Sequence, residues 1–214
     1  MEHQKAVEKS VKRSEQNASI KLPKLPVTKF DGNYANWLPF WNTFQAEVDK
    51  SGVPTVAKFA YLKEWLEPKV RTEIEGLPFT TEGYQRAKNV LESEYGKTSE
   101  IVNTHVQNIM GLPTILDGNP AKVKEFYKTL LYNTQALETL GKLDKVSGMT
   151  RNILEKLKGI KADLVRGNEG WQDWNLTHLI SELKKWRHIN PAEENGSFKK
   201  TRKTLLVAVS ERRK

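Results

Sequence analysis

Residues 30–44 read FDGNYANWLPFWNTF, and this stretch carries the strongest structural signal in the chain. Its four aromatic side chains at helical spacing are Trp37, Phe40, Trp41 and Phe44. Residues three and four apart lie on one face of an α-helix. We therefore predict a helix capped by Asn36, with Pro39 in its first turn, where a missing N–H is tolerated. An aromatic stripe of this kind can form a ligand cage, but it far more often forms a protein core, and we predict a core.

The sequence on either side of this stretch indicates different local structures. Before it, Pro23 and Pro26 favour an extended arm, because proline fixes φ and removes an N–H donor. After it, apolar stripes of helical spacing continue to about residue 190, and no alternating run indicates a strand. Helix starts are indicated at Thr80–Thr81, Asn119–Pro120 and Asn175. The predicted fold class is all-α.

The same stripes identify the side chains that we expect to form the core. In the N-terminal half these are Phe30, Trp37, Phe40, Trp41, Phe44, Phe59, Leu62 and Trp65. In the C-terminal half these are Phe126, Tyr127, Leu130, Leu137, Leu179 and Leu183. A break at Gly96–Lys97–Thr98 separates roughly four predicted helices from roughly five. Two small helical lobes explain this pattern as well as one bundle does.

Charged residues are distributed unevenly along the chain. It has 214 residues, a formal net charge of +9 and no cysteine, which excludes a disulfide scaffold, a Cys-ligated zinc site and a cysteine nucleophile. Residues 195–214 have seven basic side chains against one acidic, whereas residues 22–194 have a net charge of +1. A basic tail can bind nucleic acid through phosphates, and its alternative role is to aid solubility. The residues expected to contact phosphate are Lys199, Lys200, Arg202, Lys203, Arg212, Arg213 and Lys214.

The predicted organisation has four parts. Residues 1–21 form a polar segment that we expect to be disordered, and they lack the apolar run of a secretory signal. Residues 22–96 and 97–190 form the two helical regions, and residues 191–214 form the basic tail. No run of the sequence is long and apolar enough for a membrane span. We therefore expect a cytoplasmic protein.

No known catalytic constellation is present. The sequence lacks the glycine-rich phosphate loops, the H-E-x-x-H zinc motif and the G-x-S-x-G nucleophile motif, so we predict no enzyme, no cofactor and no small-molecule substrate. His178 and Glu182 are four residues apart, a spacing more typical of a surface pair than of a metal site. His105 falls on a largely apolar face, and we interpret it as a satisfied, semi-buried histidine. Glu73, Glu75, Glu92 and Glu94 are interpreted as solvated charge.

The order of several motifs resembles the Gag-like capsid region of LTR retrotransposons of the Bel/Pao group. The similar residues begin with Leu22–Pro23, Phe30–Asp31–Gly32 and the aromatic stripe of residues 37–44. They continue through the sequences IEGLP at residues 74–78 and LESEYG at residues 91–96, and through the apolar pattern of residues 105–141 to the helix of residues 179–186. The resemblance covers residues 22–190. Its first block is fairly specific, whereas the later blocks are ordinary helical patterns.

This resemblance implies a fold of retroviral capsid type, with two all-α lobes joined by a short linker near Gly96. It also implies a structural protein that self-assembles, through hexamers and pentamers, into virus-like particles enclosing RNA. The chain departs from the family in lacking Cys/His zinc knuckles, a protease signature and a reverse transcriptase signature. It would then be a fragment of a longer polyprotein or a shortened, domesticated Gag. The alternatives are a monomeric RNA-binding adaptor and a helical protein-interaction module that does not assemble.

Overall fold

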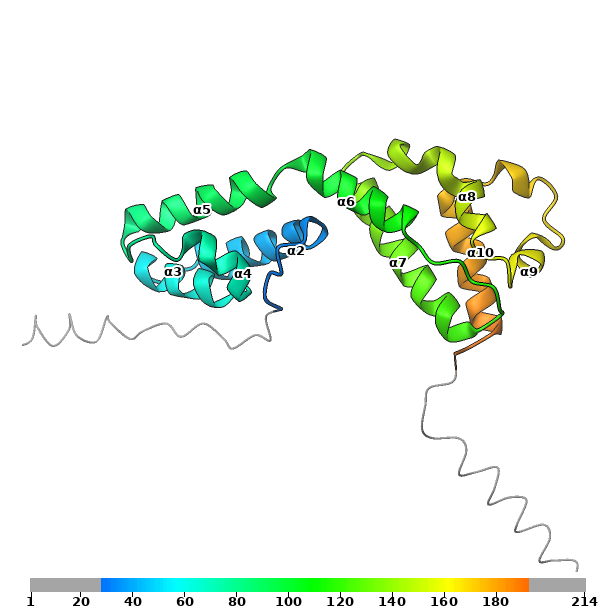
Figure 1. The fold of residues 1–214 in the computed structure, drawn as a ribbon, viewed down its shortest axis with the longest axis horizontal. Helices are drawn as coiled ribbons and strands as arrows, with labels where there is room; N and C mark the ends of the chain where they lie inside the picture. Colours follow the sequence, from blue (N-terminus) through cyan, green and yellow to red (C-terminus); the bar gives the residue numbers. More distant parts are fainter. Residues whose placement is uncertain (1–27, 193–214) are drawn as a thin grey trace, which may run out of the picture. The chain divides into compact units, whose positions relative to one another are not determined.

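The computed structural model describes residues 28–192 of the chain (Figure 1). This part is all-α, as predicted: it contains nine α-helices and no strand, and its only β-type pairing is an isolated bridge between Phe30 and Leu66. The α-helices are α2 (Tyr34–Phe44), α3 (Thr55–Glu64), α4 (Pro68–Arg71), α5 (Thr81–Tyr95), α6 (Thr98–Met110), α7 (Pro120–Thr139), α8 (Thr150–Glu155), α9 (Lys161–Val165) and α10 (Leu176–Ile189). Short 3₁₀ turns lie at Thr72–Ile74, Leu143–Met149 and Trp171–Asp173, and a π-helical turn, η1, follows α2 at Gln45–Asp49.

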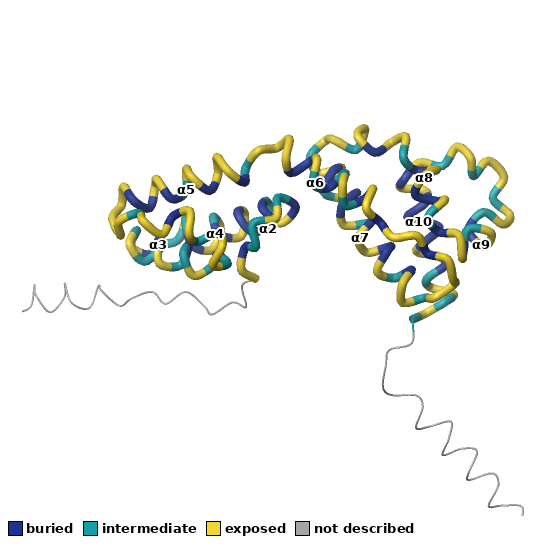
Figure 2. The backbone as a smooth tube through the Cα atoms, viewed as in Figure 1, coloured by how far each residue is buried: buried dark blue, intermediate teal, exposed yellow. Residues whose placement is uncertain are grey.

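The chain divides into two compact units, Met1–Thr104 and His105–Lys214, which we call unit 1 and unit 2. The division falls inside α6, between Thr104 and His105, rather than at the Gly96 break. Each unit has its own set of buried residues (Figure 2), and most of them are apolar. No helix in residues 28–192 has both the length and the apolar character needed to cross a membrane.

Unit 1 begins with a short strand-like contact and a glycine turn. The Phe30 N–H donates to Trp65 O at 2.8 Å, and Phe30 O accepts from the Glu67 N–H at 3.0 Å. Gly32 then has φ +79°, and a Cβ there would lie 3.1 Å from the Val70 side chain. Glycine suits this turn because a positive φ is strained for other residues.

Helix α2 begins earlier than predicted. Its N-cap is Asn33, whose side chain accepts from the Ala35 N–H at 3.0 Å. The Asn36 side chain does not cap the helix; it donates to both carboxylate oxygens of Asp31 at 3.3 Å. Pro39 therefore lies inside the helix rather than in its first turn. The earlier start is favoured because Asp31 also accepts from the Asn33 N–H, which fixes the turn before the cap.

The predicted aromatic stripe forms the centre of unit 1. The structure buries seven of the eight expected core residues there: Phe30, Trp37, Phe40, Trp41, Phe44, Phe59 and Leu62. Trp37 and Trp41 stack with ring centroids 4.8 Å apart, and Phe30 lies edge-on to Trp37 at 5.3 Å. Trp65 is only half-buried, contrary to the prediction. It follows the last residue of α3, where the chain turns toward Phe30, and its ring is T-shaped to that of Phe44 with the centroids 5.8 Å apart.

Unit 2 is organised around α7 and α10, which pack against each other (Figure 1). Both helices have the predicted caps: Asn119 accepts from the Ala121 and Lys122 N–H groups, and Asn175 accepts from the His178 N–H. The six core residues expected in this half are all buried: Phe126, Tyr127, Leu130, Leu137, Leu179 and Leu183.

The loop between α6 and α7 is held against the turn that follows α8. The Ile115 N–H donates to Lys156 O at 2.6 Å, and the Gly159 N–H donates to Ile115 O at 2.9 Å. A Cβ at Gly159 would lie 2.4 Å from the Asp117 backbone, so this approach requires glycine. The Lys156 ammonium also donates to Met110 O at 2.7 Å and Leu112 O at 2.6 Å, which satisfies carbonyls at the end of α6.

Candidate functional site

The phosphate-binding residues predicted from the sequence lie outside the described part of the chain. These are Lys199, Lys200, Arg202, Lys203, Arg212, Arg213 and Lys214. Their role stays a prediction. Within residues 28–192, the most extensive polar arrangement is a cluster around Asp49 in unit 1, which the sequence did not indicate.

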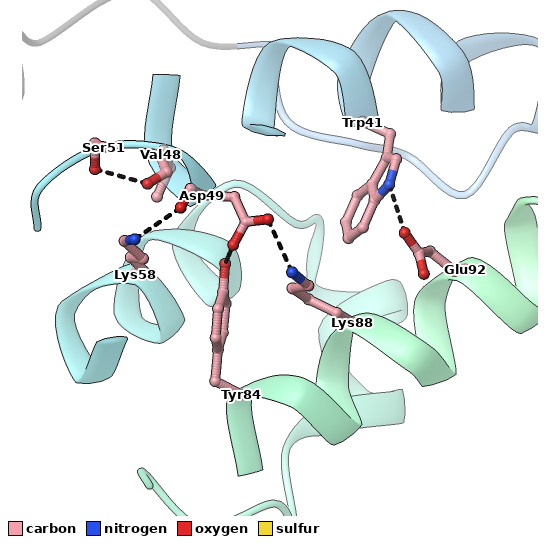
Figure 3. Close-up of polar contacts among 8 residues, drawn as sticks. All are labelled: Trp41, Val48, Asp49, Ser51, Lys58, Tyr84, Lys88 and Glu92. Atoms are coloured by element: carbon pink, nitrogen blue, oxygen red, sulfur yellow. Dashed lines mark hydrogen bonds and ion pairs between the residues drawn. The ribbon is translucent and has the colours of Figure 1, made fainter. Parts of the chain in front are cut away.

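The Asp49 cluster joins three helical segments (Figure 3). The π-helical turn η1 closes with the Lys50 N–H donating to Gln45 O, five residues back, and it carries Asp49 at its end. One carboxylate oxygen of Asp49 accepts from the Tyr84 hydroxyl at 2.6 Å, and the other accepts from the Lys88 ammonium at 2.8 Å. The backbone carbonyl of Asp49 accepts from the Lys58 ammonium at 2.7 Å. A single residue thus links η1 to α3 and α5.

Charge and burial explain the protonation states in this cluster. Burial alone would raise the pKa of Asp49, but the hydrogen bonds from Lys88 and Tyr84 and the charges of Lys88 and Lys58 outweigh it and lower the pKa. Burial, together with the hydrogen bond to the Asp49 carboxylate, raises the pKa of Tyr84 well above its ordinary value. Asp49 is therefore a stable anion, and Tyr84 is a stable hydrogen-bond donor.

This geometry suits a structural role better than a chemical one. A general base or nucleophile needs a free lone pair near a substrate and a pKa close to the working pH. Both carboxylate oxygens of Asp49 already accept strong hydrogen bonds, and the shifts of Asp49 and Tyr84 move both groups away from neutral pH. The cluster holds η1, which follows α2, against α3 and α5.

Two carboxylates that were interpreted as solvated charge also anchor aromatic side chains in unit 1. Glu92 accepts from the Trp41 indole N–H at 2.9 Å (Figure 3), and Glu73 accepts from the Tyr95 hydroxyl at 2.5 Å. Burial, followed by the hydrogen bond to Glu73, raises the pKa of Tyr95. Both carboxylates are exposed, as the interpretation implies, but each also accepts a hydrogen bond because a buried indole or phenol still needs a polar partner at its outer edge.

In unit 2, His105 lies at the centre of a buried polar group. Its side chain is 2% exposed, and Nδ1 lies 2.8 Å from Asn133 Oδ1. The Asn133 amide donates to Thr129 O at 2.7 Å, which turns its oxygen toward the imidazole and places the proton on Nδ1. Asn108 donates to the same oxygen at 3.1 Å. His105 is thus a satisfied core histidine, as predicted, and more deeply buried than expected.

The His178–Glu182 pair also differs from a free surface pair. The two side chains lie 3.8 Å apart, but Glu182 is 9% exposed and accepts from the Lys185 ammonium at 2.6 Å. The His178 ring stacks on Trp174 with centroids 4.9 Å apart. No group of three or more His, Asp or Glu side chains in residues 28–192 could hold a metal ion.

One family profile matches this chain. The family profile described as "Protein of unknown function (DUF1759)" matches residues 30–165, from the Phe30 bridge to the end of α9. The match therefore includes the Asp49 cluster, the aromatic stripe and the His105 group. No curated protein and no solved structure matches this chain.

Proposed function

The chain belongs to the DUF1759 family, and from this premise we propose that it is a structural Gag-like capsid protein of an LTR retrotransposon or a domesticated derivative. In this proposal the chain self-assembles into virus-like shells that enclose RNA in the cytoplasm. It performs no catalysis and needs no cofactor. The basic tail holds RNA through its phosphates.

One observation carries the proposal. The described chain forms two compact all-α units, each with its own core, over the residues where the sequence resembles the capsid region of Bel/Pao elements. A rigid helical unit can present the same surface to every neighbour, which a closed shell requires. The Asp49 cluster and the His105 group stiffen the two units by fixing helices with hydrogen bonds.

The exposed apolar side chains suit weak, repeated contacts. The large ones at half exposure or more are scattered over both units: Phe79, Met110, Leu116 and Ile189. No single contact of this size gives a tight dimer, because association also has a substantial entropic cost. Many weak contacts in a shell add up through multivalency, so low pairwise affinity is compatible with stable assembly.

The test is assembly of the purified full chain. We expect particles in electron micrographs after the ionic strength is raised or RNA is added, and a large increase in solution mass. A chain that stays monomeric under all of these conditions would contradict the assembly proposal. Deleting residues 195–214 separates the alternatives. A monomer whose salt-sensitive RNA binding is lost on deletion is an adaptor, and a chain unaffected by the deletion is a protein-interaction module.

A further inference from the structure

The two units have opposite charge. Among the described residues, unit 1 has nine Lys and Arg against eleven Asp and Glu, whereas unit 2 has thirteen against nine. Unit 2 therefore has a surplus of four positive charges without the tail. The net charge of residues 22–194 is close to zero because the acidic surplus of unit 1 offsets much of the basic surplus of unit 2.

Most of the surplus lies on α7 and α10. Residues 117–128 and 182–187 contain six basic side chains against three acidic, so three of the four excess charges come from these two short stretches. The guanidinium carbon of Arg187 on α10 lies 4.2 Å from the centre of the Tyr127 ring on α7. This contact joins the two helices, which pack against each other, and it brings the two basic stretches together at this point.

Helical spacing places further lysines beside this contact. Lys124 lies one turn before Tyr127, Lys128 is four residues after Lys124, and Lys184 lies one turn before Arg187. We call these four cations, Lys124, Lys128, Lys184 and Arg187, the α7–α10 basic face. Lys128 and Lys184 are exposed, and Lys124 and Arg187 are half-buried.

Three of the four cations have no acidic partner among the described residues. Lys128 pairs with Glu125 at 3.0 Å, and both of these side chains are more than half exposed. Nearby, Lys122 pairs with Asp117 and Lys185 pairs with Glu182. Lys124, Lys184 and Arg187 make no ion pair within residues 28–192, so their charge is available to an outside anion.

We propose that the α7–α10 basic face binds the phosphates of single-stranded RNA. This inference rests on the proposed function, in which RNA is the partner, and it adds a folded binding surface to the tail. The chain itself supports RNA as the occupant. Helix α10 ends at Ile189, and residues 193–214, which begin four positions later, have seven basic side chains against three acidic. A strand bound on this face can continue onto the tail, and phosphate contacts along one strand add together.

The Arg187–Tyr127 contact contributes geometry as well as charge. The guanidinium is planar, its N–H groups form a fork that matches phosphate oxygens, and the contact with the Tyr127 ring restricts where that fork lies. Lysine at the same position would supply a point charge on a flexible stem. Arg187 is therefore the member of the face whose identity, and not only its charge, should affect binding.

The experiment measures RNA affinity of the full chain against salt concentration. The test variant is Lys124→Gln with Lys184→Gln. Its matched control is Lys142→Gln with Lys145→Gln, which removes two exposed lysines beyond the other end of α7. A lost phosphate contact on a single strand reduces the slope of log K against log salt by about 0.7. We expect the test variant to have a shallower slope by about 1.4 and the control to keep the original slope.

A third variant, Arg187→Lys, tests the guanidinium plane. We expect weaker RNA binding with an almost unchanged salt slope, because the charge is kept and the fork is lost. Circular dichroism and thermal unfolding verify that each variant is folded. Rescue of the slope by Lys124→Arg with Lys184→Arg would support a charge-based site.

The outcomes separate this proposal from the assembly proposal. Equal salt slopes for the test variant and the control overturn the basic face, even if particles still form. A slope loss specific to the test variant in a chain that never assembles supports the face and contradicts the shell. Binding to vesicles of anionic phospholipid that is tighter than binding to RNA, and lost in the same variant, overturns RNA as the occupant.

Discussion

The core of unit 1 is much richer in aromatic rings than the core of unit 2, which consists largely of aliphatic side chains. Eight aromatic residues are buried in the described part of unit 1 and three in that of unit 2. Aromatic rings bring N–H and O–H groups into the core, and these groups need partners. Unit 1 accordingly has carboxylates at the edge of its core, on Asp49, Glu73 and Glu92. Unit 2 has one such pair, in which the Trp186 indole N–H donates to Asp163 at 3.4 Å, and it also buries the His105–Asn133 pair.

This difference between the cores also affects the surfaces. The carboxylates that anchor unit 1 contribute to its excess of acidic residues, and they would repel RNA phosphates. Unit 2 has one carboxylate that accepts from a core ring, on Asp163, and it has an excess of basic residues. Under the proposed function, unit 2 and the tail would contact RNA, and unit 1 would be available for protein contacts.

The largest expected effect is the loss of a ring from the unit 1 core. Trp37→Ala removes a side chain that is 2% exposed and stacked on Trp41. We expect a loss of about 3–5 kcal/mol, because the cavity cannot be refilled by the rigid rings around it. Hydrogen exchange should increase across residues 28–104 and stay slow in residues 105–192. Equal loss of protection in both units would show that they unfold together.

The next effect is the loss of the Asp49 charge. Asp49→Asn keeps an acceptor for Tyr84 but leaves the Lys88 ammonium without its anion. We expect a loss of about 1.5–3 kcal/mol at neutral pH in chemical denaturation, the range for hydrogen bonds to charged groups. Glu47→Gln in the same turn, η1, is the control, because Glu47 is exposed, and it should change stability by less than about 0.5 kcal/mol.

The same variant has a defined pH dependence. The folded-state pKa of Asp49 is below that of the unfolded chain, so its stabilisation is complete above the unfolded pKa near 3.8. The stabilisation is lost as the pH falls through the lower folded-state pKa. The difference between the wild type and Asp49→Asn should therefore be constant from pH 7 to about 5 and shrink below about 4. A difference that persists unchanged at pH 2 would contradict the ionic role.

Unit 2 offers a counterpart that contains no carboxylate. Asn133→Ala removes the acceptor of both His105 and Asn108 within a buried site. We expect a loss of about 1–3 kcal/mol, the cost of leaving a buried donor unsatisfied. Gln135→Ala, exposed on the same helix, should have almost no effect. Destabilisation confined to residues 105–192 in hydrogen exchange would show that the group stabilises its own unit.

Local signals in the sequence were sufficient for much of the fold. The stripe of residues 37–44, the caps Asn119 and Asn175 and the helical periodicity all report interactions within one helix, which a sequence displays directly. The start of α2 was missed because Asn33 and Asn36 are both good caps. The choice between them depends on Asp31, which forms hydrogen bonds to both residues.

The polar anchors could not be predicted in the same way. Asp49 and Tyr84 are 35 residues apart in the sequence, and Trp41 and Glu92 are 51 apart. Which carboxylate meets which ring depends on how the helices pack, and a single sequence does not specify this. The basic face was missed for a related reason. Net charge was counted along the chain, whereas the Arg187–Tyr127 contact joins residues 60 positions apart.

The smallest effect is expected for the loss of the Glu92 carboxylate, and it shows whether a hydrogen bond from a buried indole to an exposed carboxylate stabilises unit 1. Glu92 and Glu94 lie in the last turn of α5, and both are exposed, so the sequence treats them alike. Only Glu92 accepts from the Trp41 indole, whereas Glu94 lies 4.0 Å from the Lys97 ammonium. We expect Glu92→Ala to lose about 1 kcal/mol and Glu94→Ala to lose less than about 0.5 kcal/mol. The two changes alter helix propensity equally, so the difference between their stability losses isolates the hydrogen bond from the Trp41 indole.

The indole N–H resonance of Trp41 in an NMR spectrum should shift in Glu92→Ala alone, and equal shifts in both variants would show that the carboxylate at position 92 has no special role.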